Sequence, residues 1–202
     1  MTLSRIGMLM VIALAALWLP GCKAQDRAIG LRYIPAQARF NQKDKPVMVL
    51  MTKEAHGLPS SRTNLRIIGE FTHQSGKKQA DVLSAFPINE WARGAIAGEL
   101  RAAGINASEA DAPRADLASV ESTITEMGSN TKNHWSSSEI TARVVIAFRV
   151  VSAKGVTEFT SSGDGSARSA QGVLLNVRDA YENALRNCLK DAVPRIASAL
   201  KN

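Results

Sequence analysis

The chain has 202 residues, of which 45% are hydrophobic, and it carries 25 Lys and Arg against 18 Asp and Glu, a formal charge of +7. These values are ordinary for a globular protein, and only two cysteines are present, which excludes a disulfide-rich scaffold. The positive charge favours acidic partners, but the Lys and Arg residues are scattered along the chain. A solvated basic surface is therefore the simpler explanation.

The N-terminus has the three zones of an export signal. Arg5 supplies one positive charge, residues 6–19 form an unbroken apolar run, and Pro20-Gly21 precedes Cys22. A run of about 14 residues is shorter than the roughly 20 that cross a bilayer as a helix, and Pro20-Gly21 stops a helix. We therefore predict that residues 1–21 are a cleavable signal peptide rather than a permanent membrane span.

The segment Leu19-Pro20-Gly21-Cys22 resembles the lipobox of bacterial lipoproteins, in which signal peptidase II cuts before the cysteine. The resemblance implies cleavage between Gly21 and Cys22, and a lipid on Cys22 with acyl chains such as palmitate. Several chains together anchor a protein stably, whereas one does so only reversibly. Ordinary secretion and a short anchor helix remain the alternatives.

Lys23 follows the cysteine, and in the sorting rule for such lipoproteins an Asp at this position retains the protein at the inner membrane. The resemblance thus implies attachment to the outer membrane, facing the periplasm, with inner-membrane retention as the less favoured alternative. A periplasmic location excludes nucleic acid as a partner. Lipid phosphates, lipopolysaccharide and peptidoglycan carboxylates are the acidic partners that remain.

Removal of the signal peptide leaves about 180 residues, a length that suits one domain. We expect residues 22–28 to be the lipidated N-terminus and a short tether, and residues 29–202 to form a single α+β periplasmic domain. If Cys22 carries lipid, Cys188 has no partner, so packing rather than a disulfide must stabilise the fold.

In the first half of this domain, the pattern predicts two strands, a hairpin and a helix. Residues 29–34 alternate and end at a proline, and residues 46–51 are apolar throughout, as in a central strand buried on both faces. Residues 65–86 indicate a β-hairpin. Apolar residues at helical spacing over 88–103, between Pro87 and Gly104, predict a helix.

In the second half, strands at 116–127, 139–152 and 156–162 form an antiparallel meander, followed by a Gly163-Asp164-Gly165 loop. A long final helix carries one apolar stripe, which predicts that Cys188 is a buried filler, and Pro194 should kink the helix or end its regular part. The fold class is α+β, a mostly antiparallel sheet with two helices packed on one face. The stripe comprises Leu174, Val177, Tyr181, Leu185, Cys188, Ala192, Ile196 and Ala199.

Several stretches together resemble the YajG-type lipoprotein family. They are residues 29–35, the run 47–51, Ile68-Gly69, residues 100–105 and the terminal order of three strands and a helix. The resemblance spans nearly the whole mature chain. Because members of this family are largely described only as lipoproteins, it implies a fold and a location and carries over no catalytic residue.

We recognise no catalytic constellation, no metal site and no cofactor site in the sequence. His56, His73 and His134 are isolated in polar segments without a cysteine partner. Residues 161–166 offer hydroxyls and a carboxylate, but no histidine lies nearby in sequence and the nucleophile-elbow pattern is absent. We therefore expect that the protein is not an enzyme.

Two functions remain open. The favoured one is a non-enzymatic binding or accessory domain of the cell envelope, with an envelope protein, lipid or glycan as its partner. The alternative is an envelope hydrolase whose residues converge only in three dimensions. A deep pocket with a polar cluster would favour the hydrolase, and a flat or shallow surface would favour binding.

One polar stretch offers a speculative partner site. Trp135 lies with Lys132 and His134 in residues 128–138, which we expect to join two strands of the meander as a loop. An indole supplies rigid contact area and one polar donor, and the two basic neighbours could contact an acidic partner. The alternative is that the Trp135 ring folds back over the open end of the core.

Overall fold

The computed structural model describes residues 26–35, 45–61, 65–72, 75, 77–133, 137–169 and 173–201. The predicted signal peptide, its cleavage site at Gly21 and Cys22, and residues 23–25 lie outside the described residues. The described part of the chain forms a nine-stranded sheet and two helices. In chain order they are β1 (Arg27–Ile29), β2 (Val47–Leu50), β3 (Lys53–Glu54), β4 (Ile67–Thr72), β5 (Lys78–Ser84), α2 (Ile88–Ala102), β6 (Ala107–Ala110), β7 (Ser119–Asn133), β8 (Ser138–Ser152), β9 (Gly155–Ser169) and α3 (Val173–Lys201).

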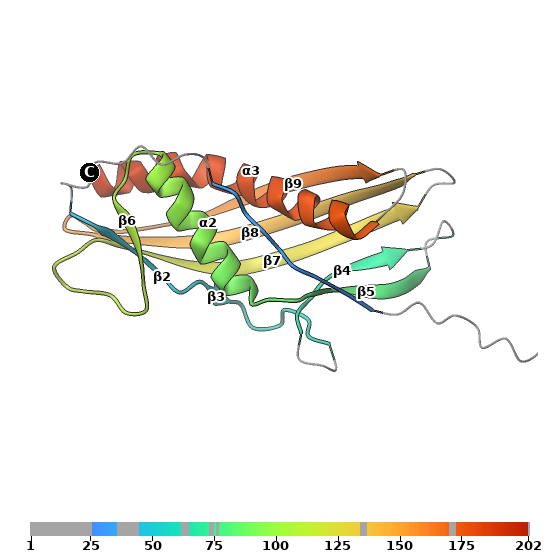
Figure 1. Ribbon diagram of the computed structural model, residues 1–202. Coiled ribbons are helices and arrows are strands. Elements are labelled where there is room, and N and C mark those ends of the chain that lie inside the picture. The colour runs from blue at the N-terminus through green and yellow to red at the C-terminus, as the bar shows by residue number, and fades with distance from the viewer. Residues whose placement is uncertain are drawn as a thin grey trace, which may run out of the picture.

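Strand β7 is the centre of the sheet (Figure 1). On one side it pairs along its length with β8, and β8 pairs with β9. On the other side, three short strands pair with successive parts of β7: β2 pairs at Ser119, β3 at Thr123 and β4 at Asn130. Strand β6 then extends the sheet beyond β2, and β5 and β1 extend it beyond β4.

The predicted α+β class is confirmed, and the sheet is mixed rather than purely antiparallel. Its long ladders are antiparallel, because β7, β8 and β9 follow one another in sequence with only a few residues between them. The short ladders that β1, β2, β3 and β4 make with distant strands are parallel. Parallel partners are far apart in sequence, so local turn signals do not reveal them.

The predicted elements of the first half are largely confirmed. Strand β2 is buried along its whole length between β6 and β7, the β4–β5 hairpin is antiparallel, and α2 fills the predicted helix. The prediction of a strand over 29–34 is wrong, because β1 ends at Ile29. The chain then leaves the sheet and packs on α2, where Pro35 occupies the space that a Cβ of Gly98 would need.

The meander strands are longer than the sequence indicated. β7 continues to Asn133, so the interpretation of residues 128–138 as a loop is wrong for most of that stretch. Gly163-Asp164-Gly165 lies in the middle of β9 and is not a loop. Both errors have one cause. Alternate residues of these strands are polar because they face solvent, or glycine because they pack against a helix backbone, and such residues are also typical of loops.

Both helices cover the same face of the sheet and share one core with it, as predicted. Buried residues alternate along β8, where Ala142 and Val144 are buried while the side chain of Arg143 between them is about half exposed. The stripe predicted for α3 is buried from Val177 to Ile196. The opposite face of β7, β8 and β9 is open to solvent, and we call it the open face.

Helix α3 continues through Pro194 to Lys201, so the predicted end of the helix is not seen at the proline. Pro194 is exposed on the solvent side, and Lys190, whose carbonyl loses its usual donor, is exposed as well. Ala192 and Ile196 are buried on the other side. Water can thus satisfy the Lys190 carbonyl while packing holds the turn in place.

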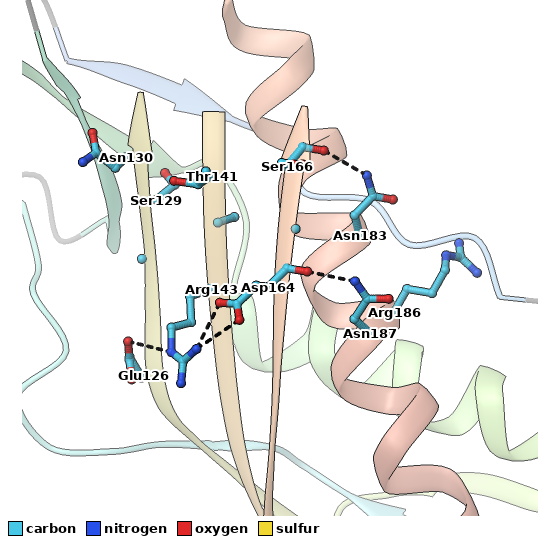
Figure 2. Close-up of a pocket in the computed structure, with 13 residues that line it drawn as sticks. Glu126, Ser129, Asn130, Thr141, Arg143, Asp164, Ser166, Asn183, Arg186 and Asn187 are labelled. Atoms are coloured by element: carbon cyan, nitrogen blue, oxygen red, sulfur yellow. Dashed lines mark hydrogen bonds and ion pairs between the residues drawn. The ribbon is translucent and has the colours of Figure 1, made fainter. Parts of the chain in front are cut away.

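Two edge strands are covered by helix side chains. Along β9, Asn187 Nδ2 donates to the Asp164 carbonyl (2.8 Å) and Asn183 Nδ2 to the Ser166 carbonyl (3.3 Å). Figure 2 shows these side chains reaching from α3 to the strand. The bonds occupy outward carbonyls that would otherwise be open to another strand.

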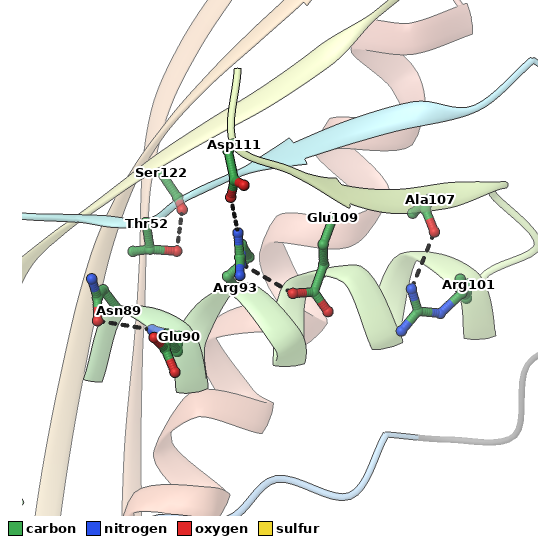
Figure 3. A network of polar contacts seen from close by, with 9 residues as sticks. All are labelled: Thr52, Asn89, Glu90, Arg93, Arg101, Ala107, Glu109, Asp111 and Ser122. Carbon is green, nitrogen blue, oxygen red and sulfur yellow. Dashed lines mark hydrogen bonds and ion pairs between the residues drawn. The ribbon is translucent and has the colours of Figure 1, made fainter. Parts of the chain in front are cut away.

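Strand β6 is covered in the same way by α2. Arg101 donates to the Ala107 carbonyl (3.1 Å), and Arg93 lies 3.0 Å from both Glu109 and Asp111 (Figure 3). An unpaired strand edge invites another chain to pair with it. The two helices therefore protect the edges at β6 and β9 as well as the core.

The packing of α3 on β9 depends on missing side chains. A Cβ on Gly163 would lie 2.1 Å from the Ala184 carbonyl oxygen, and a Cβ on Gly165 equally close to that of Ala180. Only glycine lets the helix backbone lie against the strand at these positions. This close approach brings the Asn side chains of α3 within reach of the β9 carbonyls.

A candidate binding groove on the open face

A groove of about 720 Å³ lies across β7, β8 and β9, and we call it the groove. Its polar side chains include Asn130 on β7, Thr141 and Arg143 on β8, and Asp164 and Ser166 on β9 (Figure 2). Asn183 and Asn187 of α3 close it at the β9 edge. The groove therefore lies mainly on the solvent-facing side of the sheet.

A bulge in β7 sets which residues face the groove. The pairing of β7 with β8 shifts between Ile124 and Glu126, and Thr125 and Glu126 are both exposed. One extra residue exchanges the two faces of a strand. After the bulge, Met127 points into the core, while Glu126 and Asn130 point to the open face.

A cross-strand triad of charged side chains lies in the groove. Arg143 Nε lies 3.3 Å from Glu126 and its Nη1 lies 3.0 Å from Asp164. Their side chains are 47%, 57% and 72% exposed, so solvent screens the attraction and little stability follows from it. Hydrogen bonding to Asp164 raises the pKa of Arg143, which stays charged.

The same arrangement recurs further along the open face. Arg149 lies 2.8 Å from Glu121 on β7 and 3.3 Å from Glu158 on β9. In each triad an arginine on the middle strand is flanked by carboxylates on both neighbours. The repetition explains why the open face is polar without being strongly basic.

The floor of the groove is made of small residues. Gly128 lines it, and a Cβ there would meet nothing within 4 Å. Hydroxyls of Thr141 and Ser166, the Asn130 amide and the charged triad surround this floor. Such a set offers both donors and acceptors to a polar ligand. The described residues lining the groove include no histidine and no cysteine.

The predicted partner site is only partly visible. Lys132 is exposed on β7, two residues beyond Asn130, whereas His134 and Trp135 lie outside the described residues. Sequence reasoning missed the groove in part because Asn130 and Asp164, which help to line it, lie in stretches that looked like loops. The alternation of polar residues over 139–152 was the signal that could have identified an open face.

The predicted environment of Cys188 is confirmed, since this free cysteine has no exposed surface. Burial raises the pKa of the Cys188 thiol to about 11. Ser161 donates to the Cys188 carbonyl (2.8 Å), and the thiol donates to the Ser161 carbonyl (3.5 Å). The thiol thus contributes to the contact between α3 and β9.

Among the described residues, no three histidine, cysteine, aspartate or glutamate side chains come together as metal ligands. His56 is exposed in a turn, and His73 and His134 lie outside the described residues. Neither described helix has the length and apolar character needed to cross a bilayer.

No family model and no curated protein matches this sequence. Among solved structures, one described as an uncharacterised protein is 9% identical with a TM-score of 0.43, covering 88% of this chain and 97% of its own. Another, a Xanthomonas campestris protein assigned to the DUF330 family, is 12% identical with a TM-score of 0.48, covering 87% of this chain and 94% of its own. Likenesses at this level carry no argument about function.

Proposed function

We propose that this protein is a lipid-anchored lipoprotein of the YajG type, held at the outer membrane by Cys22, which binds another envelope component through the groove. The anchor rests on Leu19-Pro20-Gly21-Cys22. The observation that carries the binding role is the shape of the groove, an exposed polar trough across three strands. An envelope protein, lipid or glycan could fill it.

The exposure of the groove favours binding over the alternative of an envelope hydrolase. Efficient hydrolysis needs preorganised groups in a site that excludes water, where their electrostatic effect is large. The three charged side chains of the triad are about half exposed or more, and each is already paired. This arrangement suits the recognition of a polar surface.

The anchor can be tested separately from the groove. Cells that express the protein are labelled with an alkyne fatty acid, and the wild type and Cys22→Ala are compared. We expect label and membrane association in the wild type and neither in the variant. A Cys22→Ala protein that still carried label in the membrane would overturn the anchor.

The groove is tested by photo-crosslinking in intact cells. A photoreactive residue replaces Thr141 in the groove or, as the control, the exposed Ala153 in the β8–β9 turn. We expect an adduct from position 141 that protease, lysozyme or lipid extraction assigns to a protein, glycan or lipid. Equal adducts from both positions would refute a specific groove. Turnover of purified peptidoglycan or phospholipid by the protein would favour the hydrolase.

A further inference from the structure

The distance between the proposed anchor and the fold is short. The Asp26 carboxylate accepts a hydrogen bond from the Asp81 amide (2.9 Å), and Arg27 is already paired in β1. Cys22 is four residues before Asp26. Four fully extended residues span at most about 14 Å, so the lipid-bearing residue stays within this distance of Asp26. The predicted tether of residues 22–28 therefore ends by residue 26.

The strand register shows where Asp26 lies along the molecule. Asp81 pairs with Glu70, and Glu70 pairs with Asn130 on β7. Asn130 is three residues, or about 10 Å, from the end of β7 at Asn133, but eleven residues, or about 36 Å, from its start. The anchor can reach the first of these ends, which we call the near end, and it cannot reach the other.

A row of charged side chains crosses the near end of the open face. The register aligns Thr72 with Lys78 on β5 and with Lys132 on β7, and it continues through Glu139 on β8 to Arg168 on β9. We call these five residues the near-end row, with three cations and one carboxylate. Lys78 is engaged by Glu70 and Asp81, and Arg168 Nη2 lies 3.2 Å from Glu139 although the Arg168 side chain is 79% exposed. Lys132 is exposed.

Resting on the proposed lipid anchor, we propose that the near-end row lies on the anionic headgroup surface of the membrane, with Lys132 and Arg168 donating to lipid phosphates. The short tether brings this end of the fold to the bilayer, and the cations complement its charge. The long strands then point away from the membrane. The groove begins at Asn130, beside the near-end row, and opens close to the headgroups.

The experiment uses the full lipidated protein in vesicles. A fluorophore is attached at Ser137→Cys, between β7 and β8 at the near end, or, as the control, at Lys154→Cys, an exposed lysine at the opposite end of the β7–β9 meander, both with Cys188→Ala. The probe at 137 leaves Lys132 and Arg168 in place. Headgroup-nitroxide lipids in phosphatidylglycerol vesicles should quench more than half of the emission at 137 and little at 154. Vesicles of phosphatidylcholine alone should give weaker quenching at 137.

A charge variant tests the role of the cations. Arg168→Gln should weaken the association with anionic vesicles, as reported by the probe at 137, by on the order of five-fold, which is the effect of one basic residue at an anionic surface. Arg149→Gln, which removes the arginine of a triad far from the near end, should have no effect. Equal quenching at 137 and 154 in a chain shown to be acylated would overturn the orientation. An absence of acylation would instead refute the anchor itself.

Discussion

Replacing Gly163 with alanine tests the strand-to-helix contact most directly. The new Cβ would lie 2.1 Å from the Ala184 carbonyl oxygen and 2.3 Å from the Cys188 nitrogen. Both are backbone atoms and neither can rotate away, so α3 must withdraw by about 1.3 Å to reach an ordinary contact of 3.4 Å. Overpacking of this kind costs about 1–3 kcal/mol. Loss of the Asn187 bond to Asp164 adds about 1 kcal/mol, for a total of about 2–4 kcal/mol.

Gly128→Ala is the matched control, because a Cβ at that position meets nothing within 4 Å. An alanine there should leave stability unchanged or raise it by up to about 1 kcal/mol through the lower entropy of the unfolded chain. Urea unfolding followed by far-ultraviolet circular dichroism gives both free energies. If Gly163→Ala and Gly128→Ala unfold at the same urea concentration, α3 does not lie against the β9 backbone as described.

Three further predictions concern single side chains. Burial raises the pKa of the Cys188 thiol in the folded protein to about 11 from an ordinary value of 9.0, so the stability that the thiol contributes is complete below pH 9 and falls as the pH rises to 11. The free energy of unfolding, measured from pH 9 to pH 11, should therefore fall more in the wild type than in Cys188→Ala. Parallel pH dependences of the two proteins would contradict this prediction. Tyr181→Phe removes the hydroxyl that donates to the buried Ile68 carbonyl and leaves that carbonyl with the longer bond from Ser129 Oγ (3.4 Å). It should cost about 0.5–1.5 kcal/mol in urea unfolding, whereas an unchanged midpoint would argue against the bond. Arg143→Gln should leave the unfolding midpoint unchanged while it reduces crosslinking from position 141, and an unaffected adduct would exclude the triad from binding.

The elements that follow from local pattern were predictable. The apolar run of β2, the hairpin of β4 and β5, and the periodicity of both helices each reflect neighbours in sequence. Strand β6 was missed because Ala107-Ser108-Glu109-Ala110 has no β-branched residue, and its pairing with β2 is a long-range contact. The parallel pairing of β2, β3 and β4 with β7 also depends on long-range contacts.

The groove was beyond prediction for a different reason. The groove residues on β9 and on the second half of β7 lie in stretches whose polar and glycine content usually marks loops, and here that content reflects an open face and a close helix. The bulge at Thr125 also changes which residues face solvent, and a single sequence gives no sign of its position. The open face could be inferred from β8 alone, but not the side chains that surround the groove.

The contact between α3 and β9 has a consequence for how the molecule opens. Because glycines place the helix backbone on the strand and Asn183 and Asn187 bond to its carbonyls, neither element can separate without exposing the other. Segments linked in this way unfold together as one cooperative unit in native-state hydrogen exchange. Amides of β9 should therefore exchange at the same rate as those in the middle of α3, although β9 lies at the border of the sheet, where exchange is usually fast.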